Sequence, residues 1–180
     1  MLNTVCPKLR IAGIIQDSIV DGPGIRFVIF TQGCPHHCPG CHNPQTHDFS
    51  GGYEADAEEL LQKIYDNPIL SGVTFSGGEP FCQAEALLPI AEAVKVHGKH
   101  LMIYTGYLYE QLLAIKDPFV QRLLELADVL VDGPFILAER NLTLQYRGSE
   151  NQRVIDLKKT KEAGEIVLYR SEYEELEDNW

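Results

Sequence analysis

One stretch of the chain joins a strand-like run to a cysteine-rich loop: Ile25-Arg26-Phe27-Val28-Ile29-Phe30-Thr31-Gln32-Gly33-Cys34-Pro35-His36-His37-Cys38-Pro39-Gly40-Cys41. Its three cysteines fall within eight residues. Three thiolates on one tight loop can bind metal, but they are one short of a closed zinc site or of the four cysteines that normally hold a 4Fe-4S cluster. The metal position that remains open is where reactive sites keep their chemistry.

The composition predicts one globular domain in a reducing compartment. A chain of 180 residues that is 44% hydrophobic can bury one substantial core, so we expect a single domain over residues 1–170 and an acidic tail over 171–180. Five cysteines, three of them crowded together, argue against a disulfide framework. No apolar run is long enough to cross a membrane, and the first residues lack the pattern of a secretory signal. We therefore expect a cytoplasmic protein with no membrane partner.

The net charge of −11 comes from 15 Lys and Arg against 26 Asp and Glu. An acidic chain is a poor candidate for binding nucleic acid, because that binding depends mainly on neutralising phosphates. One segment reverses the sign, since residues 140–161 hold six bases and two acids, a net charge of +4. These bases could form either a solvated face or a docking surface for a protein partner, and the sequence leaves both interpretations open. They are Arg140, Arg147, Arg153, Lys158, Lys159 and Lys161.

Strand-like and helix-like segments alternate along the chain. We predict strands at 25–31, 72–75, 101–104 and 128–131, with weaker ones at 153–157 and 165–169. The spacing of apolar residues predicts helices at 55–66, 84–97, 108–115 and 119–126. This alternation is typical of an α/β fold with a parallel sheet or part of a (β/α) barrel.

Each of the first four predicted strands ends in a distinctive loop. After the cysteine loop these are Ser76-Gly77-Gly78-Glu79-Pro80, Thr105-Gly106-Tyr107 and Asp132-Gly133-Pro134. In parallel α/β folds, ligands bind at the carboxyl ends of the strands. The four loops therefore predict one shared pocket.

A structural zinc site, with His36, His37 or His42 as fourth ligand, is one interpretation of the cysteine loop. Such sites usually take a second ligand pair from a distant segment, whereas Cys6 and Cys82 stand alone. Zinc is therefore the less favoured interpretation.

The spacing of Cys34, Cys38 and Cys41 is similar to the signature of radical S-adenosylmethionine (SAM) enzymes. The resemblance implies that these three cysteines hold a 4Fe-4S cluster and that the fourth iron binds SAM. It also implies that the chemistry belongs to the two cofactors, with no further catalytic side chain.

The second match to this family is Gly77-Gly78-Glu79-Pro80. A Gly-Gly turn after a strand is a weak signal alone, but in the family this motif follows the next strand and meets the amino group of SAM. Glycines permit such close approach. The resemblance implies a set of cofactor-binding residues: Gly77, Gly78 and Glu79 at the methionine end, Gly40, Cys41 and His42 near the adenine, and Thr105 and Asp132 as further candidates. Arg26 and Asp132 could equally form ordinary salt bridges.

Asp21-Gly22-Pro23-Gly24-Ile25-Arg26, with Gln32-Gly33-Cys34-Pro35 and Cys41-His42-Asn43-Pro44, resembles the N-terminal block of glycyl-radical-enzyme activases. Within these, Gly40 and the segment 147–153 are similar to the activating proteins of anaerobic ribonucleoside-triphosphate reductase. The resemblance covers about residues 11–155.

This resemblance implies a partial (β/α) barrel of the radical SAM type that cleaves SAM reductively and makes a glycyl radical on a large partner enzyme. Flavodoxin or ferredoxin is the expected electron donor. A pyruvate formate-lyase-type activase, and a non-catalytic zinc or redox-sensing module, are the alternatives. The roles of Cys82, Arg147 and Arg153 are left open by the sequence.

Overall fold

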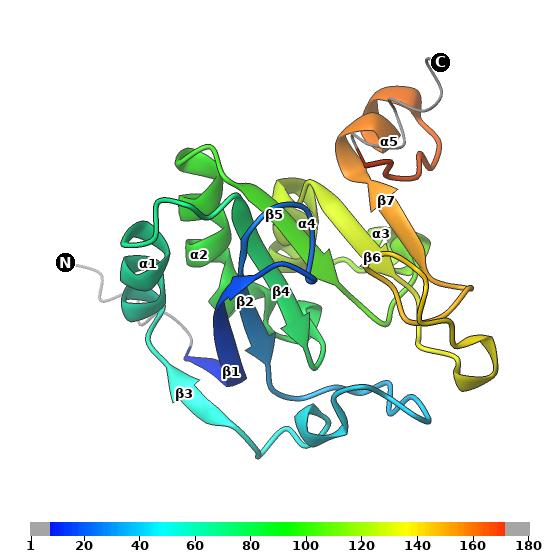
Figure 1. Cartoon of the computed structure of the whole chain (residues 1–180), viewed down its shortest axis with the longest axis horizontal. Helices are drawn as coiled ribbons and strands as arrows, with labels where there is room; N and C mark the ends of the chain where they lie inside the picture. The colour runs from blue at the N-terminus through cyan, green and yellow to red at the C-terminus, as the bar shows by residue number, and fades with distance from the viewer. Residues whose placement is uncertain (1–7, 172–180) are drawn as a thin grey trace.

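One sheet of seven strands forms the centre of the molecule (Figure 1). The computed structural model describes residues 8–171. The strands are β1 (Leu9–Ser18), β2 (Arg26–Thr31), β3 (Tyr53–Ala55), β4 (Gly72–Gly77), β5 (His100–Tyr104), β6 (Val129–Asp132) and β7 (Arg153–Asp156). The helices are α1 (Ala57–Tyr65), α2 (Ala84–Val96), α3 (Tyr109–Ala114), α4 (Pro118–Leu126) and α5 (Leu157–Ala163), with short 3-10 turns η1 (Pro44–Thr46), η2 (Pro80–Gln83) and η3 (Leu137–Glu139).

The middle of the sheet is parallel. Its strand order is β3-β1-β2-β4-β5-β6-β7. The four adjacent strands β2, β4, β5 and β6 are parallel to one another. β1, β3 and β7 pair antiparallel. The predicted α/β fold is confirmed and the predicted parallel sheet is correct for the four central strands, while the whole sheet is mixed.

The two faces of the sheet are covered differently. Helices α1 to α4 pack on one face through a continuous core, in which Phe75 of β4 and Leu87 of α2 are fully buried. The other face carries a smaller apolar cluster that includes Met102 and Val131. In Figure 1 the loop between β1 and β2 passes over this second face. The second face, free of helices α1 to α4, is the one that the pocket uses.

The predicted helices are confirmed with ends that shift by at most two residues, and capping residues explain most of the shifts. Asp56 precedes α1 and accepts from the amides of Glu58 (2.7 Å) and Glu59 (3.3 Å). Asp117 caps α4 in the same way, ahead of Pro118 at the first helical position.

Two strands were not predicted from the sequence, and one predicted strand was wrong. β3 is only three residues long, and β1 is interrupted by register shifts between Ile11 and Gly13 and between Ile15 and Ser18. The predicted strand at 165–169 is only an isolated bridge between Ile155 and Leu168.

The residues before that bridge form α5 instead. The side chain of Asp156 caps the helix by accepting from the amide of Lys159 (2.9 Å). Gly164 ends it with a left-handed φ of 71°. The predicted strand at 153–157 therefore stops at Asp156.

The predicted tail, apart from Ser171, lies outside the described residues. Across residues 8–171, no helix has both the length and the apolar character that crossing a bilayer requires.

Candidate functional site

The cysteine loop is closed by backbone hydrogen bonds between its two ends. The amide of Gly33 donates to the carbonyl of Thr46 (2.8 Å), and the amide of Cys34 donates to the carbonyl of His47 (3.1 Å). These bonds hold the loop at the carboxyl end of β2, where ligands of parallel sheets bind.

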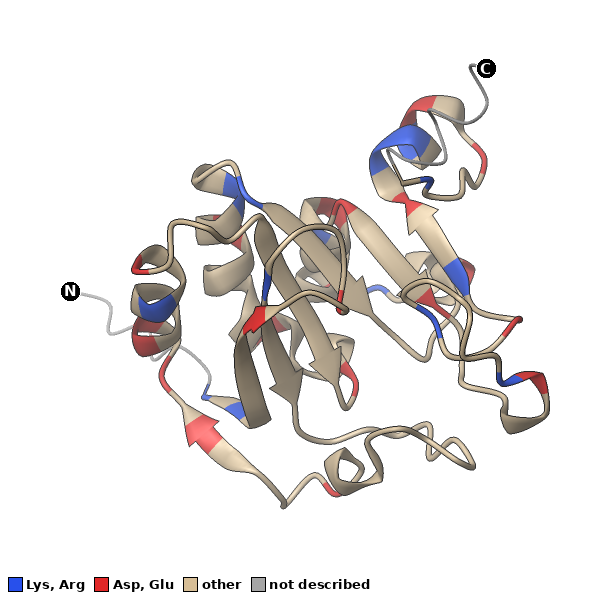
Figure 2. Ribbon diagram, in the orientation of Figure 1, with Lys and Arg blue, Asp and Glu red and all other residues tan. Residues whose placement is uncertain are grey.

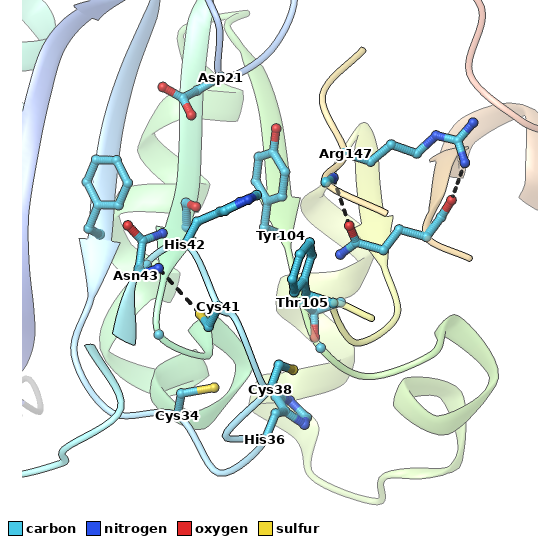
Figure 3. Close-up of a pocket in the computed structure, with 18 of the residues that line it drawn as sticks. Asp21, Cys34, His36, Cys38, Cys41, His42, Asn43, Tyr104, Thr105 and Arg147 are labelled. Carbon is cyan, nitrogen blue, oxygen red and sulfur yellow. Dashed lines mark hydrogen bonds between the residues drawn. The ribbon is translucent and has the colours of Figure 1, made fainter. Parts of the chain in front are cut away.

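The three cysteine side chains of the loop lie around one end of a pocket (Figure 3). Cys34 is buried, whereas Cys38 and Cys41 are half-buried. The amide of Cys41 donates to the carbonyl of Cys38 (3.1 Å), so a tight turn keeps these two residues together. The amide of Asn43 donates to the Sγ of Cys41 (3.4 Å), which fixes the direction of this side chain.

The pocket has a volume of about 540 Å³, within the range of small-molecule sites. All four predicted strand-end loops contribute to its lining: the cysteine loop, Gly77 and Gly78, Thr105 and Gly106, and Gly133. The prediction that these loops form one pocket is therefore confirmed.

The structure brings most of the predicted site residues to this pocket, but not all of them. The predicted residues that line it are Cys34, Cys38, Cys41, His42, Gly77, Gly78 and Thr105. Gly40, Glu79 and Asp132 do not line it. Gly40 packs on the neighbouring loop instead, since an added Cβ would lie 2.8 Å from the Cδ1 of Leu137. Glu79 is fully buried and hydrogen-bonded to the surrounding loops.

Asp132 forms an internal salt bridge. It is fully buried and accepts from the Nε of Arg153 (2.9 Å) and the amide of Tyr109 (2.8 Å). Arg153 also pairs with Glu110 (2.8 Å). The salt-bridge interpretation of Asp132 therefore describes this structure, and Arg153 joins β7 to β6 and α3.

Arg26 also lies away from the pocket. Its guanidinium is fully buried and donates to the carbonyl of Val73 (2.6 Å) and the hydroxyl of Thr74 (3.0 Å). Burial lowers the pKa of Arg26 to about 10. It joins β2 to β4 at their amino ends.

Strand ends also contribute to the lining. Phe30, Ser76 and Tyr104 come from the ends of β2, β4 and β5, and all point to the face free of helices α1 to α4. Ser76 belongs to the predicted loop 76–80 and Tyr104 directly precedes the predicted loop 105–107, whereas Phe30 was not predicted, although the period-2 alternation of its strand could have identified it. Phe135 and Tyr146 come from the long segment between β6 and β7, which has no periodic signal.

The donor set fits a 4Fe-4S cluster better than a zinc ion. Zinc needs its ligands converging on one atom at about 2.0–2.3 Å. Within residues 8–171, no three His, Cys, Asp or Glu side chains converge in this way. The thiolates of an iron–sulfur cluster bind different irons, so they need not converge on one atom, and the three cysteines all lie at the same end of the pocket.

The far part of the pocket is shaped by glycines and rings. The rings of His42 and Phe135 lie 4.9 Å apart between centroids. A Cβ added at Gly148 would come within 2.8 Å of His42 and 3.2 Å of Phe135. Glycine at this position therefore makes room for the two rings, which line the pocket and suit a flat ligand group.

Burial affects the ionisation of the groups in and near the pocket. Desolvation, with a smaller contribution from Glu79, raises the pKa of the Cys34 thiol. Desolvation also raises the pKa of Tyr104. Metal binding at Cys34 would therefore have to displace a proton.

The cysteine side of the site has almost no charged residues. Residues 32–47 contain no Lys, Arg, Asp or Glu, and Figure 2 shows this part of the chain in tan. Aside from histidines and cysteines, the ionic side chains that line the pocket are Asp21 and Arg147. Asp21 lies at the end of the pocket opposite the cysteines in Figure 3, and Arg147 donates to the carbonyls of Glu150 (2.9 Å) and Gln152 (2.8 Å).

Comparison with known proteins agrees with this geometry. Residues 20–155 match the model of the 4Fe-4S single cluster domain family. The chain belongs to this family.

Curated relatives narrow the assignment. The chain is 37% identical to the anaerobic ribonucleoside-triphosphate reductase-activating protein of Vibrio cholerae, over 74% of this chain and 89% of that protein. The Escherichia coli K12 protein of the same name is 32% identical over 78% of this chain and 94% of its own length. The chain is thus a member of the glycyl-radical-enzyme activases, as its motifs indicated.

A pyruvate formate-lyase-activating enzyme of Clostridium pasteurianum is 46% identical over 60% of this chain. The matched part is 49% of that enzyme, so the chain spans about half its length. The crystal structure of QueE from Escherichia coli overlaps 55% of this chain at 21% identity, with a TM-score of 0.44. The family match argues against the alternative of a zinc module, because the matched family is one of 4Fe-4S domains.

Proposed function

We propose that the chain is a radical SAM activase that cleaves S-adenosylmethionine reductively and generates a glycyl radical on anaerobic ribonucleoside-triphosphate reductase. The pocket carries this proposal: three cysteines of one loop gather at one end, and five glycines open its walls. The names of relatives that this chain covers over 89% and 94% of their lengths support the choice of partner.

In this proposal Cys34, Cys38 and Cys41 would hold the cluster at the cysteine end of the pocket. The bound cluster and SAM would together supply the reductive radical chemistry, while the protein orients them and excludes water. Gly77 and Gly78 leave the end of β4 free of side chains, so a ligand can approach the backbone there.

His42 and Phe135 would hold the adenine. Position 40 is glycine, so the residue just before the third cysteine has no ring that could stack on the adenine. The tilted ring pair of His42 and Phe135 offers an apolar surface inside the same pocket.

We also propose that the fold is a partial (β/α) barrel of the radical SAM type within a single domain. Four parallel strands, helices α1 to α4 packed on one face and a pocket on the other support this proposal. Flavodoxin or ferredoxin remains the expected electron donor.

Anaerobic reconstitution with iron, sulfide, SAM and the reductase tests the function. The expected result is a glycyl radical on the reductase, detected by electron paramagnetic resonance, that is absent with the Cys41→Ser variant. A protein that takes up the cluster and cleaves SAM but gives no radical on the reductase would exclude this partner. Radical formation on pyruvate formate-lyase in a parallel assay would then favour the alternative, a pyruvate formate-lyase-type activase. The 46% identity to the clostridial enzyme is the reason for including this assay.

A further inference from the structure

Glu79 occupies a place in the structure that its motif does not predict. Its side chain is fully buried and does not line the pocket, although Gly77 and Gly78 beside it do. Carboxylates are almost never fully buried unless they are paired or hydrogen-bonded. The partners of this carboxylate therefore indicate its role.

Each carboxylate oxygen of Glu79 accepts from one backbone amide. Oε1 accepts from Phe81 (3.1 Å) and Oε2 accepts from Gly106 (2.9 Å). The Oγ1 of Thr105 lies 3.0 Å from each of the two oxygens, so its hydroxyl can donate to the carboxylate. A glutamine would turn its NH2 group toward one of the two backbone donors in either orientation. The surroundings therefore select a carboxylate.

The remaining side-chain partner belongs to the cysteine loop. The Nε2 of His36 donates to Oε2 of Glu79 (2.8 Å), and the amide of Glu79 donates to the carbonyl of Gly33 (2.8 Å). His36 lies between Cys34 and Cys38 in the sequence. Glu79 thus joins the loop after β2 to the loop after β5.

The ring of His36 is confined on its other sides. It packs edge-on against Tyr107, with 4.5 Å between ring centroids. A Cβ added at Gly106 would lie 2.3 Å from the ring, so glycine is needed to make room for it. The amide of Tyr107 donates to the hydroxyl of Thr105 (3.1 Å), which leaves the hydroxyl proton to point at Glu79.

We propose that Glu79 is a positioning residue whose carboxylate clamps the cysteine loop, through His36, to the loop of Thr105 and Gly106, and does not contact SAM. The clamp keeps Cys34 and Cys38 directed at the cluster position. This role rests on the proposed function for what the loop holds, but the clamp itself is a property of the protein without cofactors.

Hydrogen–deuterium exchange on the cofactor-free protein tests the clamp alone. Glu79→Gln is expected to speed exchange about tenfold at the amide of Gly106 and across residues 33–41, because a buried donor loses its acceptor. Glu85→Gln removes the same charge from an exposed position on α2 and is expected to leave these rates unchanged. Wild-type exchange in Glu79→Gln would overturn the clamp.

The reconstituted protein separates positioning from SAM contact. Positioning predicts that Glu79→Gln loses iron and sulfide to a chelator about tenfold faster, while the SAM Kd of the loaded fraction stays within about twofold. A normal rate of cluster loss with a SAM Kd raised about tenfold would overturn the proposal, because Glu79 would then be a SAM ligand. If the wild-type protein takes up no cluster, the proposed function fails, and the exchange measurement still decides the clamp.

Gly106→Ala tests the clamp with Glu79 intact, which matters if Glu79→Gln does not fold. The added methyl displaces the His36 ring, so cluster loss is expected to accelerate as in Glu79→Gln. Gly13→Ala is the matched control, because nothing lies within 4 Å of an added Cβ there. Wild-type cluster retention in Gly106→Ala would contradict the proposal.

Discussion

Cys82 shows how a cysteine near the site can still lie outside its chemistry. The residue is exposed and does not line the pocket, yet its thiol is desolvated, which raises its pKa to about 11. Because Cys82 does not line the pocket, it is not among the proposed cluster ligands.

Substitution of single cysteines is therefore expected to divide them sharply. Cys41→Ser removes one of the three proposed ligands and should abolish both cluster binding and SAM cleavage. Cys82→Ser should retain both. Iron and sulfide per chain after anaerobic reconstitution give the measurement, and loss of the cluster in a folded Cys82→Ser protein would contradict the three-ligand site.

The glycines of the pocket differ in what a side chain would disturb. A Cβ at Gly78 would lie 2.4 Å from the carbonyl oxygen of Gly33, so a substitution there would move the cysteine loop as well as the ligand space. A Cβ at Gly148 would meet only the rings of His42 and Phe135 among its nearest neighbours. Gly148 is therefore the better position for testing SAM binding alone.

Gly148→Val is expected to weaken SAM binding while cluster content stays normal. Overpacking of this kind costs roughly 1–3 kcal/mol, which corresponds to about a tenfold or greater rise in Kd. Gly13→Val, in open space on β1, is the control. Titration of the reconstituted protein with SAM measures the effect, and an unchanged Kd would exclude the ring pair of His42 and Phe135 from the SAM site.

At the scale of elements, buried apolar runs made the central strands predictable. Residues 27–29 of β2 and 101–103 of β5 are continuous buried hydrophobic stretches. β1 was missed because its bulges break the pattern, and α5 was missed because capping by Asp156 converts the end of a predicted strand into a helix start. Local pattern thus located the strands and helices of the buried core. It failed where a register shift or a single capping side chain decides the structure.

The edge strand β7 depends on one ion pair. Asp132 of β6 is fully buried, and Arg153 of β7 is partly exposed, with Glu110 as its second partner. Asp132→Ala is expected to lower the free energy of unfolding by about 2–3 kcal/mol, less than for a fully buried pair because solvent reaches Arg153. Glu110→Ala should cost about 1 kcal/mol or less. Denaturant unfolding measures both, and equal losses would contradict the assignment.

The first residue of β5 gives the fold a dependence on pH. Burial, with Arg26 nearby, lowers the pKa of His100 to about 4, and its Nδ1 is buried without a hydrogen-bond partner in residues 8–171. Between about pH 6.5 and pH 4 the unfolded chain binds more protons at this residue, so its contribution to stability is lost as pH falls. From pH 7 to pH 5 the wild type should lose about 1–2 kcal/mol more than His100→Gln. Denaturant unfolding at each pH measures this difference. If the free energy of unfolding had the same pH dependence in the wild type and in His100→Gln, this role of His100 would be contradicted.

At the scale of the whole molecule, the sequence predicted where the site lies better than how its walls are made. The cysteine and glycine loops were predictable because each follows a recognisable strand in a parallel sheet. Phe135, Tyr146 and Gly148 were not, because they belong to the aperiodic segment between β6 and β7. The direction of the Glu79 side chain depends on loops 43 and 27 residues away, which no local pattern contains.

The structure shows which bases of the positive segment 140–161 are available to a partner. Arg153 is held by Asp132 and Glu110, so it does not belong to a docking surface. The positive segment 140–161 still presents exposed Arg140 and Lys158, and Figure 2 shows bases on α5 and β7 at one side of the molecule. In a chain of net charge −11, this local reversal can steer an acidic patch of the partner.

Charge reversal at both exposed positions tests this steering. The double variant Arg140→Glu with Lys158→Glu is expected to slow glycyl-radical formation on the reductase by about tenfold at low salt, with a smaller effect at high salt, because steering acts on encounter rates and is screened. Uncoupled SAM cleavage with dithionite should not change, since neither residue lines the pocket. Lys63→Glu on α1, which Figure 2 shows at the other end of the sheet, is the control. Equal losses of both activities would assign these bases to the fold, and unchanged radical formation would leave the segment as a solvated face.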